Sequence, residues 1–219
     1  MLAHPNKKVS FPQTSRTEVA VSYALKATLV AGAVYALILR DYFMIFSAII
    51  AVIGSMIPAI LYRQWRFVLP IELDLILTGF ISAHFILGEL GEFYVKYWWF
   101  DLFLHDFSGF VIGIVGFVWS YMLFYTNKIK ANPWFILVFT ISLAMAAGAV
   151  WEIFEFSMDQ LFGFNMQKSG LKDTMGDLIV CIVGSVFSGI LGYFYLKYHK
   201  DGLIRRLIMC WKREDTIRG

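Results

Sequence analysis

Residues 134–158 read WFILVFTISLAMAAGAVWEIFEFSM, an apolar stretch whose only charged residues, Glu152 and Glu155, lie near its C-terminal end. A helix that crosses the hydrocarbon core of a bilayer needs about 20 mostly apolar residues. A polar turn that ends in Pro133 precedes the stretch. The stretch therefore predicts a membrane-spanning helix with two carboxyl groups near one end.

The whole chain is rich in apolar residues, as this stretch is. Its 219 residues are 59% hydrophobic, 18% aromatic and only 16% charged, with a mean hydropathy of +0.66. Soluble domains contain about 45–50% apolar and about 25% charged residues. This composition excludes an ordinary soluble enzyme, a disordered protein and a nucleic-acid reader. The formal net charge of +3 is concentrated in the two tails, as is typical of membrane topology signals.

Five further stretches have the same apolar character, and the breaks between the six are too short to hold another domain. The six predicted spans are Val19–Leu39, Tyr42–Leu61, Val68–Leu87, Leu102–Tyr125, Trp134–Met158 and Thr174–Tyr195. We therefore predict an all-α, polytopic membrane protein with one six-helix transmembrane domain. The predicted domain covers residues 18–196, between a tail over residues 1–17 and a basic tail over residues 197–219.

The distribution of Lys and Arg predicts the orientation of these helices. Basic residues are enriched on the cytoplasmic side of membrane proteins. With both tails inside, the predicted outer side carries only Arg40, Lys96, Lys168 and Lys172, whereas the tails and inner loops carry nearly all the others. The pattern predicts that both termini are cytoplasmic in a multi-pass protein of the bacterial inner (plasma) membrane.

On this topology, ionisable residues gather near the outer ends of three helices, in pairs that share one helical face. The pairs are Asp101 and His105, Glu152 and Glu155, and Asp173 and Asp177. Residues three or four apart lie on the same side of an α-helix. The faces of the first and third pairs continue through Gly109 and Gly184, and such small residues let helices approach closely. We therefore expect these faces to point into the bundle.

Clustered carboxylates cannot all remain ionised without a counter-charge. Oxygen ligands together with imidazole suit Mg, Mn, Ca, Zn or non-haem Fe, and the sequence does not choose among these ions. The predicted ligands of a divalent cofactor ion are Asp101, His105, Asp173 and Asp177. Glu152 and Glu155 are the predicted catalytic carboxylates, one of them as general base. Four polar residues nearby are predicted to contact a substrate: His84, Asn165, Gln167 and Lys168.

Simpler interpretations of the same residues remain open. The paired acids could serve as helix caps and interfacial ion pairs, and Asp173 is well placed to cap a helix. His84 could make an ordinary hydrogen bond between helices. Asn165 and Gln167 could belong to a plain turn.

Three segments of the chain resemble the YjdF-like bacterial inner-membrane proteins, which carry an H-x-x-x-G, an E-x-x-E and a D-x-x-x-D in successive helices. The segments are His105-Asp106-Phe107-Ser108-Gly109, Trp151-Glu152-Ile153-Phe154-Glu155-Phe156 and Asp173-Thr174-Met175-Gly176-Asp177-Leu178. The likeness covers residues 68–195, and a looser one links the chain to VanZ-type membrane proteins. The resemblance implies six helices and the same polar residues, but no particular reaction.

The sequence thus predicts an integral membrane protein with a divalent-cation site, used for metal-dependent chemistry on a lipid or envelope precursor. A cation- or proton-coupled transporter is the first alternative, and six helices without an internal repeat would then favour a homo-oligomer. A structural protein without catalysis is the second. Membrane lipids are the expected partners, and nucleic acid is not.

Overall fold

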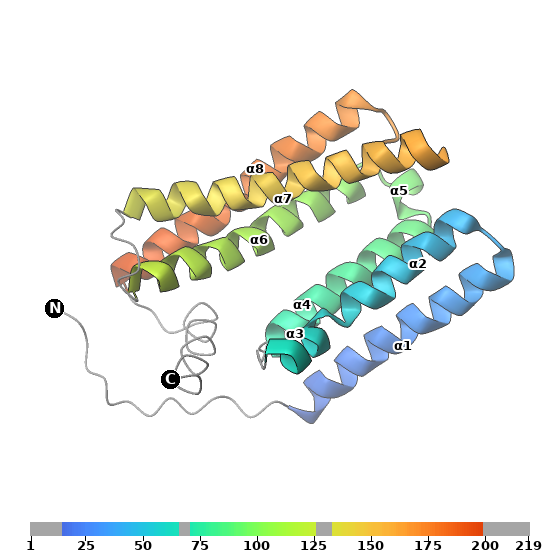
Figure 1. The fold of residues 1–219 in the computed structure, drawn as a ribbon, viewed down its shortest axis with the longest axis horizontal. Coiled ribbons are helices and arrows are strands. Elements are labelled where there is room, and N and C mark those ends of the chain that lie inside the picture. Colours follow the sequence, from blue (N-terminus) through green and yellow to red (C-terminus); the bar gives the residue numbers. More distant parts are fainter. Residues whose placement is uncertain (1–14, 66–70, 126–132, 199–219) are drawn as a thin grey trace.

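A computed structural model describes residues 15–65, 71–125 and 133–198. All regular structure in these ranges is helical (Figure 1). The elements are α1 (Arg16–Leu39), α2 (Tyr42–Ser55), α3 (Ile57–Trp65), α4 (Ile71–Ser82), the π-helix η1 (Ala83–Leu90), α5 (Phe93–Lys96), α6 (Phe100–Tyr125), α7 (Pro133–Phe162) and α8 (Leu171–Tyr198). The predicted all-α membrane fold is confirmed.

Five helical segments are long and apolar enough to cross a membrane, and a sixth is added if the bent pair α2 and α3 forms one span. The bend of 44° follows Ser55, where we expected an unbroken helix from Tyr42 to Leu61. Pro58 explains the break, because proline has no N–H to donate to the carbonyl four residues earlier. The cytoplasmic placement of both termini remains a prediction, and both expected tails lie largely outside the described residues.

The long helices form two groups (Figure 1). In the N-terminal unit, α1, α2 and α4 pack on one another, and in the C-terminal unit α6, α7 and α8 do so. Each unit has its own apolar core. Leu29, Ala48, Ala51 and Phe85 form the core of the first, while Ile114, Phe117, Val118 and Ile136 form that of the second. The fold therefore offers two separate interiors in which polar groups can be buried.

Aromatic rings join the two units. Phe46 of α2 stacks on Phe154 of α7 with ring centroids 6.2 Å apart, and Phe80 of α4 stacks on Phe107 of α6 at 6.1 Å. Figure 1 shows that the units converge towards α5, the short helix between η1 and α6. This end of the molecule also carries the first turn of α6 and the loop between α7 and α8.

Glycine allows α6 and α8 to approach each other closely, on the two faces where the sequence predicted close packing. A Cβ atom on Gly109 would lie 2.4 Å from the carbonyl oxygen of Cys181, and one on Gly184 would lie 2.0 Å from that of Asp106. Real side chains cannot occupy such positions, so both contacts require glycine. The crossing places the first turns of α6 beside the first turns of α8, where the predicted ligands lie.

Candidate functional site

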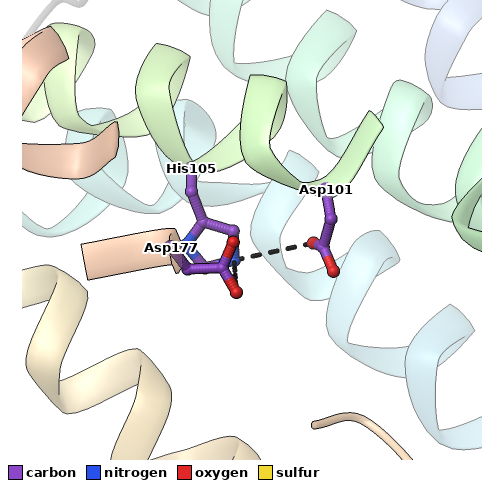
Figure 2. Close-up of side chains that lie close together, drawn as sticks. All are labelled: Asp101, His105 and Asp177. Carbon is purple, nitrogen blue, oxygen red and sulfur yellow. Dashed lines mark ion pairs between the residues drawn. The ribbon is translucent and has the colours of Figure 1, made fainter. Parts of the chain in front are cut away.

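Three of the predicted ligands point towards one another between α6 and α8 (Figure 2). One ligand atom from each of Asp101, His105 and Asp177 lies within 4.8 Å of the others. The Nε2 atom of His105 is 3.7 Å from Asp101 Oδ1 and 4.0 Å from Asp177 Oδ2. The two carboxylates therefore converge on one imidazole nitrogen, at distances longer than direct hydrogen bonds.

Glu152 of α7 approaches the same histidine from its other side. Its Oε1 lies 3.8 Å from His105 Nδ1. Glu152 is 4% exposed and Asp177 is 2% exposed. Both oxygens of Glu152 and Oδ2 of Asp177 are buried without a hydrogen-bond partner among the described residues. The side chains of Gln167 and Thr174, which are hydrogen-bonded to each other at 2.6 Å, lie beside Glu152, and each can donate a further hydrogen bond to its carboxylate.

The remaining two predicted acids occupy different surroundings. Glu155 is buried and accepts a hydrogen bond of 2.8 Å from Trp151 Nε1, one helical turn earlier on α7. Asp173 lies in the first turn of α8 and is not one of the three converging ligands. Its first-turn position suits the capping interpretation as well as the ligand interpretation. Its role as a ligand stays a prediction.

A lysine closes one side of the cluster. Lys168, in the loop between α7 and α8, places its Nζ 2.9 Å from Asp101 Oδ2. The same ammonium group lies 4.1 Å from the centroid of the Tyr94 ring. The ammonium group thus neutralises one oxygen of Asp101 and leaves the other facing His105. The sequence predicted Lys168 as a substrate contact, and the structure pairs it with one of the predicted ligands.

Tyr94 links this lysine to the other predicted histidine. Its hydroxyl group is hydrogen-bonded to His84 Nδ1 at 2.5 Å, and its ring fills the space that a Cβ on Gly88 would need, 2.2 Å away. Burial, together with the negative charge of Asp101 and nearby acids, raises the pKa of the Tyr94 phenol well above its ordinary value. The phenol is therefore neutral and serves as a hydrogen-bonding group.

The loop residues predicted to contact a substrate divide into two kinds. Gln167 has structural contacts: its backbone N–H donates to Asp159 at 2.9 Å, beside a similar bond from Met166 of 2.7 Å. Asn165 and Lys168 have exposed surface, so they can meet a molecule outside the bundle. The turn interpretation thus fits Gln167, whereas Asn165 and Lys168 remain candidates for substrate contact.

These residues form a chemically reasonable cation site. Two carboxylates and an imidazole are a mixed oxygen and nitrogen donor set of the kind that binds divalent transition metals and Mg²⁺ or Mn²⁺. A buried carboxylate oxygen without a partner is costly, and in native proteins such a group is normally explained by a bound ion or water. The orphan oxygens of Asp177 and Glu152 lie on opposite sides of His105.

Sequence reasoning missed two residues of this region. Trp151 was not predicted to be a site residue, although its spacing from Glu155 allowed the hydrogen bond that the structure shows. Tyr94 gave no signal at all, because its contacts with His84 and Lys168 depend on how η1 and α5 fold back. The expected hydrogen bond of His84 is present, with Tyr94 as the partner.

Comparison with known proteins gives a family but no activity. A protein of Thermotoga maritima described as "Uncharacterized protein" is 28% identical over 137 residues, which are 60% of this chain and 67% of the relative. No solved structure matches the chain. Neither description contains the name YjdF, so that narrower resemblance remains a prediction. The family described as "Predicted membrane protein (DUF2238)" matches residues 21–198, and the chain belongs to this family.

Proposed function

We propose that this membrane protein binds a divalent cation between α6, α7 and α8 and uses it for chemistry on a lipid or envelope precursor. The observation that carries the proposal is the group of Asp101, His105 and Asp177, whose ligand atoms lie within 4.8 Å of one another. Asp177 and the adjacent Glu152 also contain buried oxygens without partners among the described residues.

The charge balance of the cluster supports a divalent ion. Asp101, Glu152 and Asp177 are three carboxyl groups around one imidazole, and Lys168 is paired with one oxygen of Asp101. One ammonium group cannot compensate three carboxylates in a medium of low dielectric constant. A divalent cation would supply the missing positive charge and accept the unpartnered oxygens as ligands.

Each residue then has a distinct role. Asp101, His105 and Asp177 hold the ion, and Asp173 is a further candidate ligand one turn earlier on α8. Glu152, buried against His105, is placed to accept a proton from a polarised water or substrate. Glu155 is held by Trp151 and is better placed to orient α7 than to react. Among the substrate candidates, Lys168 and Asn165 are the groups with exposed surface.

A cation- or proton-coupled carrier is the second candidate, and one observation favours it. The N-terminal unit contains a partly buried ion pair between Lys26, within the first spanning segment, and Asp74, in the first turn of α4. Ionisable residues inside membrane helices are costly and often belong to ion or proton pathways. A carrier would show substrate-dependent cation flux in proteoliposomes, whereas an enzyme would convert a lipid without such flux.

The direct test is elemental analysis of the purified protein in detergent. We expect near-stoichiometric divalent metal in the wild type and its loss in the double variant His105→Ala/Asp177→Ala. Asp106→Asn is the matched control, because Asp106 lies beside His105 on α6 but outside the group of three ligands. This control should retain the metal and the elution volume of the wild type.

Binding by added metal completes the test. Dialysis against a chelator, followed by titration with Mn²⁺ or Zn²⁺, should restore one site in the wild type and in Asp106→Asn. Absence of metal from a folded wild-type protein, before and after titration, would contradict the proposal. That result would favour one of the two alternatives, a proton-coupled carrier or a structural protein without catalysis.

A further inference from the structure

The N-terminal unit contains a second polar group that the proposed cation site does not use. Lys26 of α1 places its Nζ 2.8 Å from Asp74 Oδ1 and 3.0 Å from Ser22 Oγ. The hydroxyl group of Ser22 also donates to Asp74. Unlike the cluster near α5, this group is electrically balanced, because one ammonium group faces one carboxylate.

The polar character continues along α4 beyond Asp74. Thr78 and Ser82 follow at intervals of four residues and are 0% and 7% exposed. In a regular helix they lie about 40° and about 80° around the axis from Asp74, and roughly 6 and 12 Å along it. These three residues therefore form one buried stripe that begins at the ion pair and continues into the bundle.

The two hydroxyl groups of this stripe differ from the buried hydroxyls of Thr140 and Ser120. Thr140 donates to Ile136 O at 2.7 Å and Ser120 to Phe117 O at 3.0 Å, within their own helices. Thr78 Oγ1 and Ser82 Oγ are buried and have no hydrogen-bond partner among the described residues. Buried hydroxyl groups in native proteins are almost always satisfied, by protein or by ordered water.

We propose that the stripe of Asp74, Thr78 and Ser82, with Ser22 and Lys26 opposite its start, binds a short file of water molecules. A buried water needs two to four polar partners. The carboxylate, the ammonium group and the successive hydroxyls supply such partners at about one per helical turn. We place the entrance of the file at Lys26, whose side chain is 30% exposed.

Apolar packing closes the other end of the file. Leu29 of α1 and Phe85 of η1 are both 0% exposed and share a core with Ala48 and Ala51. Phe85 follows Ser82 by less than one helical turn. Water that enters beside Lys26 would therefore stop at this core. The proposed water site does not depend on the proposed function, since it shares no residue with the cation cluster.

Cysteine accessibility tests the inference in the full chain. The background is Cys181→Ser/Cys210→Ser, to which Thr78→Cys or Ser82→Cys is added; Ala48→Cys, in the apolar core, is the matched control. The reagent is a small, charged methanethiosulfonate, present on both sides of the membrane. We expect it to label Thr78→Cys and Ser82→Cys at least about tenfold faster than Ala48→Cys, because a thiol ionises to its reactive thiolate only where water is present. Equal, slow labelling of Ser82→Cys and Ala48→Cys in folded protein would overturn the inference.

A thermal measurement gives an independent answer if a cysteine variant folds poorly. Thr78→Val removes the hydroxyl group at nearly constant volume. If water satisfies this hydroxyl, the variant loses hydrogen bonds and its Tm should fall, by roughly 2–4 °C for a chain of this size. If the hydroxyl is dry, its removal relieves an unsatisfied group and the Tm should rise, which would contradict the proposed site. Thr140→Val, with an equally buried but hydrogen-bonded hydroxyl, provides the reference.

Discussion

The N-terminal and C-terminal units bury charge in opposite ways. In the first, Lys26 and Asp74 form a one-to-one pair at 2.8 Å, and Ser22 bonds to both. In the second, the distances from His105 to its acidic neighbours are 3.7–4.0 Å and several carboxylate oxygens have no partner among the described residues. The charges of the Lys26–Asp74 pair cancel without any ligand, whereas the excess negative charge of the cluster favours binding of a cation.

The largest effect is expected when the balanced pair is broken. Asp74→Asn leaves the Lys26 ammonium group without its counter-charge inside a spanning segment. Removal of one partner of a buried pair costs about 3–5 kcal/mol, and the partial exposure of Lys26 favours the lower end of that range. Thermal or SDS-induced unfolding in detergent should show this loss.

The double variant Lys26→Met/Asp74→Leu is the control for that prediction. It removes both charges, so most of the lost stability should return. A double variant as unstable as Asp74→Asn would show that these side chains stabilise the protein through packing and not through their charges. The contrast between a charge-balanced N-terminal unit and an unbalanced C-terminal unit would then be wrong.

The same chemical change in the cluster should have the opposite sign. Without a divalent cation, Asp177→Asn removes one of several crowded carboxylates and should stabilise the protein by about 1 kcal/mol. With a cation at 100 times its Kd, the wild type should gain about 2.7 kcal/mol and the variant much less. The Tm with and without Mn²⁺ measures both effects. If Asp177→Asn destabilised the chelator-treated protein, the cluster would not carry the excess negative charge that distinguishes it from the Lys26–Asp74 pair.

The next largest loss of stability is expected when the close crossing of α6 and α8 is disturbed. A Cβ on Gly184 would lie 2.0 Å from the carbonyl oxygen of Asp106, so Gly184→Ala must push α8 away from α6. Overpacking of this kind costs about 1–3 kcal/mol, and the cation affinity should fall with it because Asp177 moves from His105. Gly79→Ala is the control, since a Cβ there meets nothing within 4 Å. Unfolding curves and metal titration on both variants test the prediction.

The sequence was sufficient for the helices and for part of the site. Apolar runs predicted the spanning segments because bilayer thickness fixes their length, and Pro58 contained the signal for the break that we missed. Spacing predicted that Asp101 and His105 share a face, and Gly109 and Gly184 predicted close packing of the faces that carry the ligands, but not that α6 and α8 are the helices that cross there.

Contacts that depend on loops and on tertiary packing could not be predicted in this way. Lys168 reaches Asp101 from a loop bounded by Gly163 and Gly170, both with positive φ, and no periodicity encodes that conformation. Lys26 pairs with Asp74 across 48 positions of the chain, and no spacing rule links residues so far apart.

Replacement of Tyr94 should give the smallest change in stability. The titration of its phenol also tests whether the surroundings of Tyr94, beside the cluster, are as buried and as negatively charged as the structure indicates. Tyr94→Phe removes the hydrogen bond to His84 and should cost about 1 kcal/mol. Because the pKa of the Tyr94 phenol is raised in the folded state, its contribution is present below the ordinary pKa of about 10 and is lost as the pH rises above it.

Phenolate absorbance separates Tyr94 from the other tyrosines among the 11 of the chain. In metal-free folded protein titrated to about pH 11, wild type and Tyr94→Phe should differ by less than the amplitude of one tyrosine, because the pKa of the Tyr94 phenol is raised. In unfolded protein the variant should lack the amplitude of one tyrosine. A difference of a full tyrosine between the two folded proteins would show that the pKa of Tyr94 is not raised, and would contradict the buried, negatively charged surroundings that the structure gives this phenol.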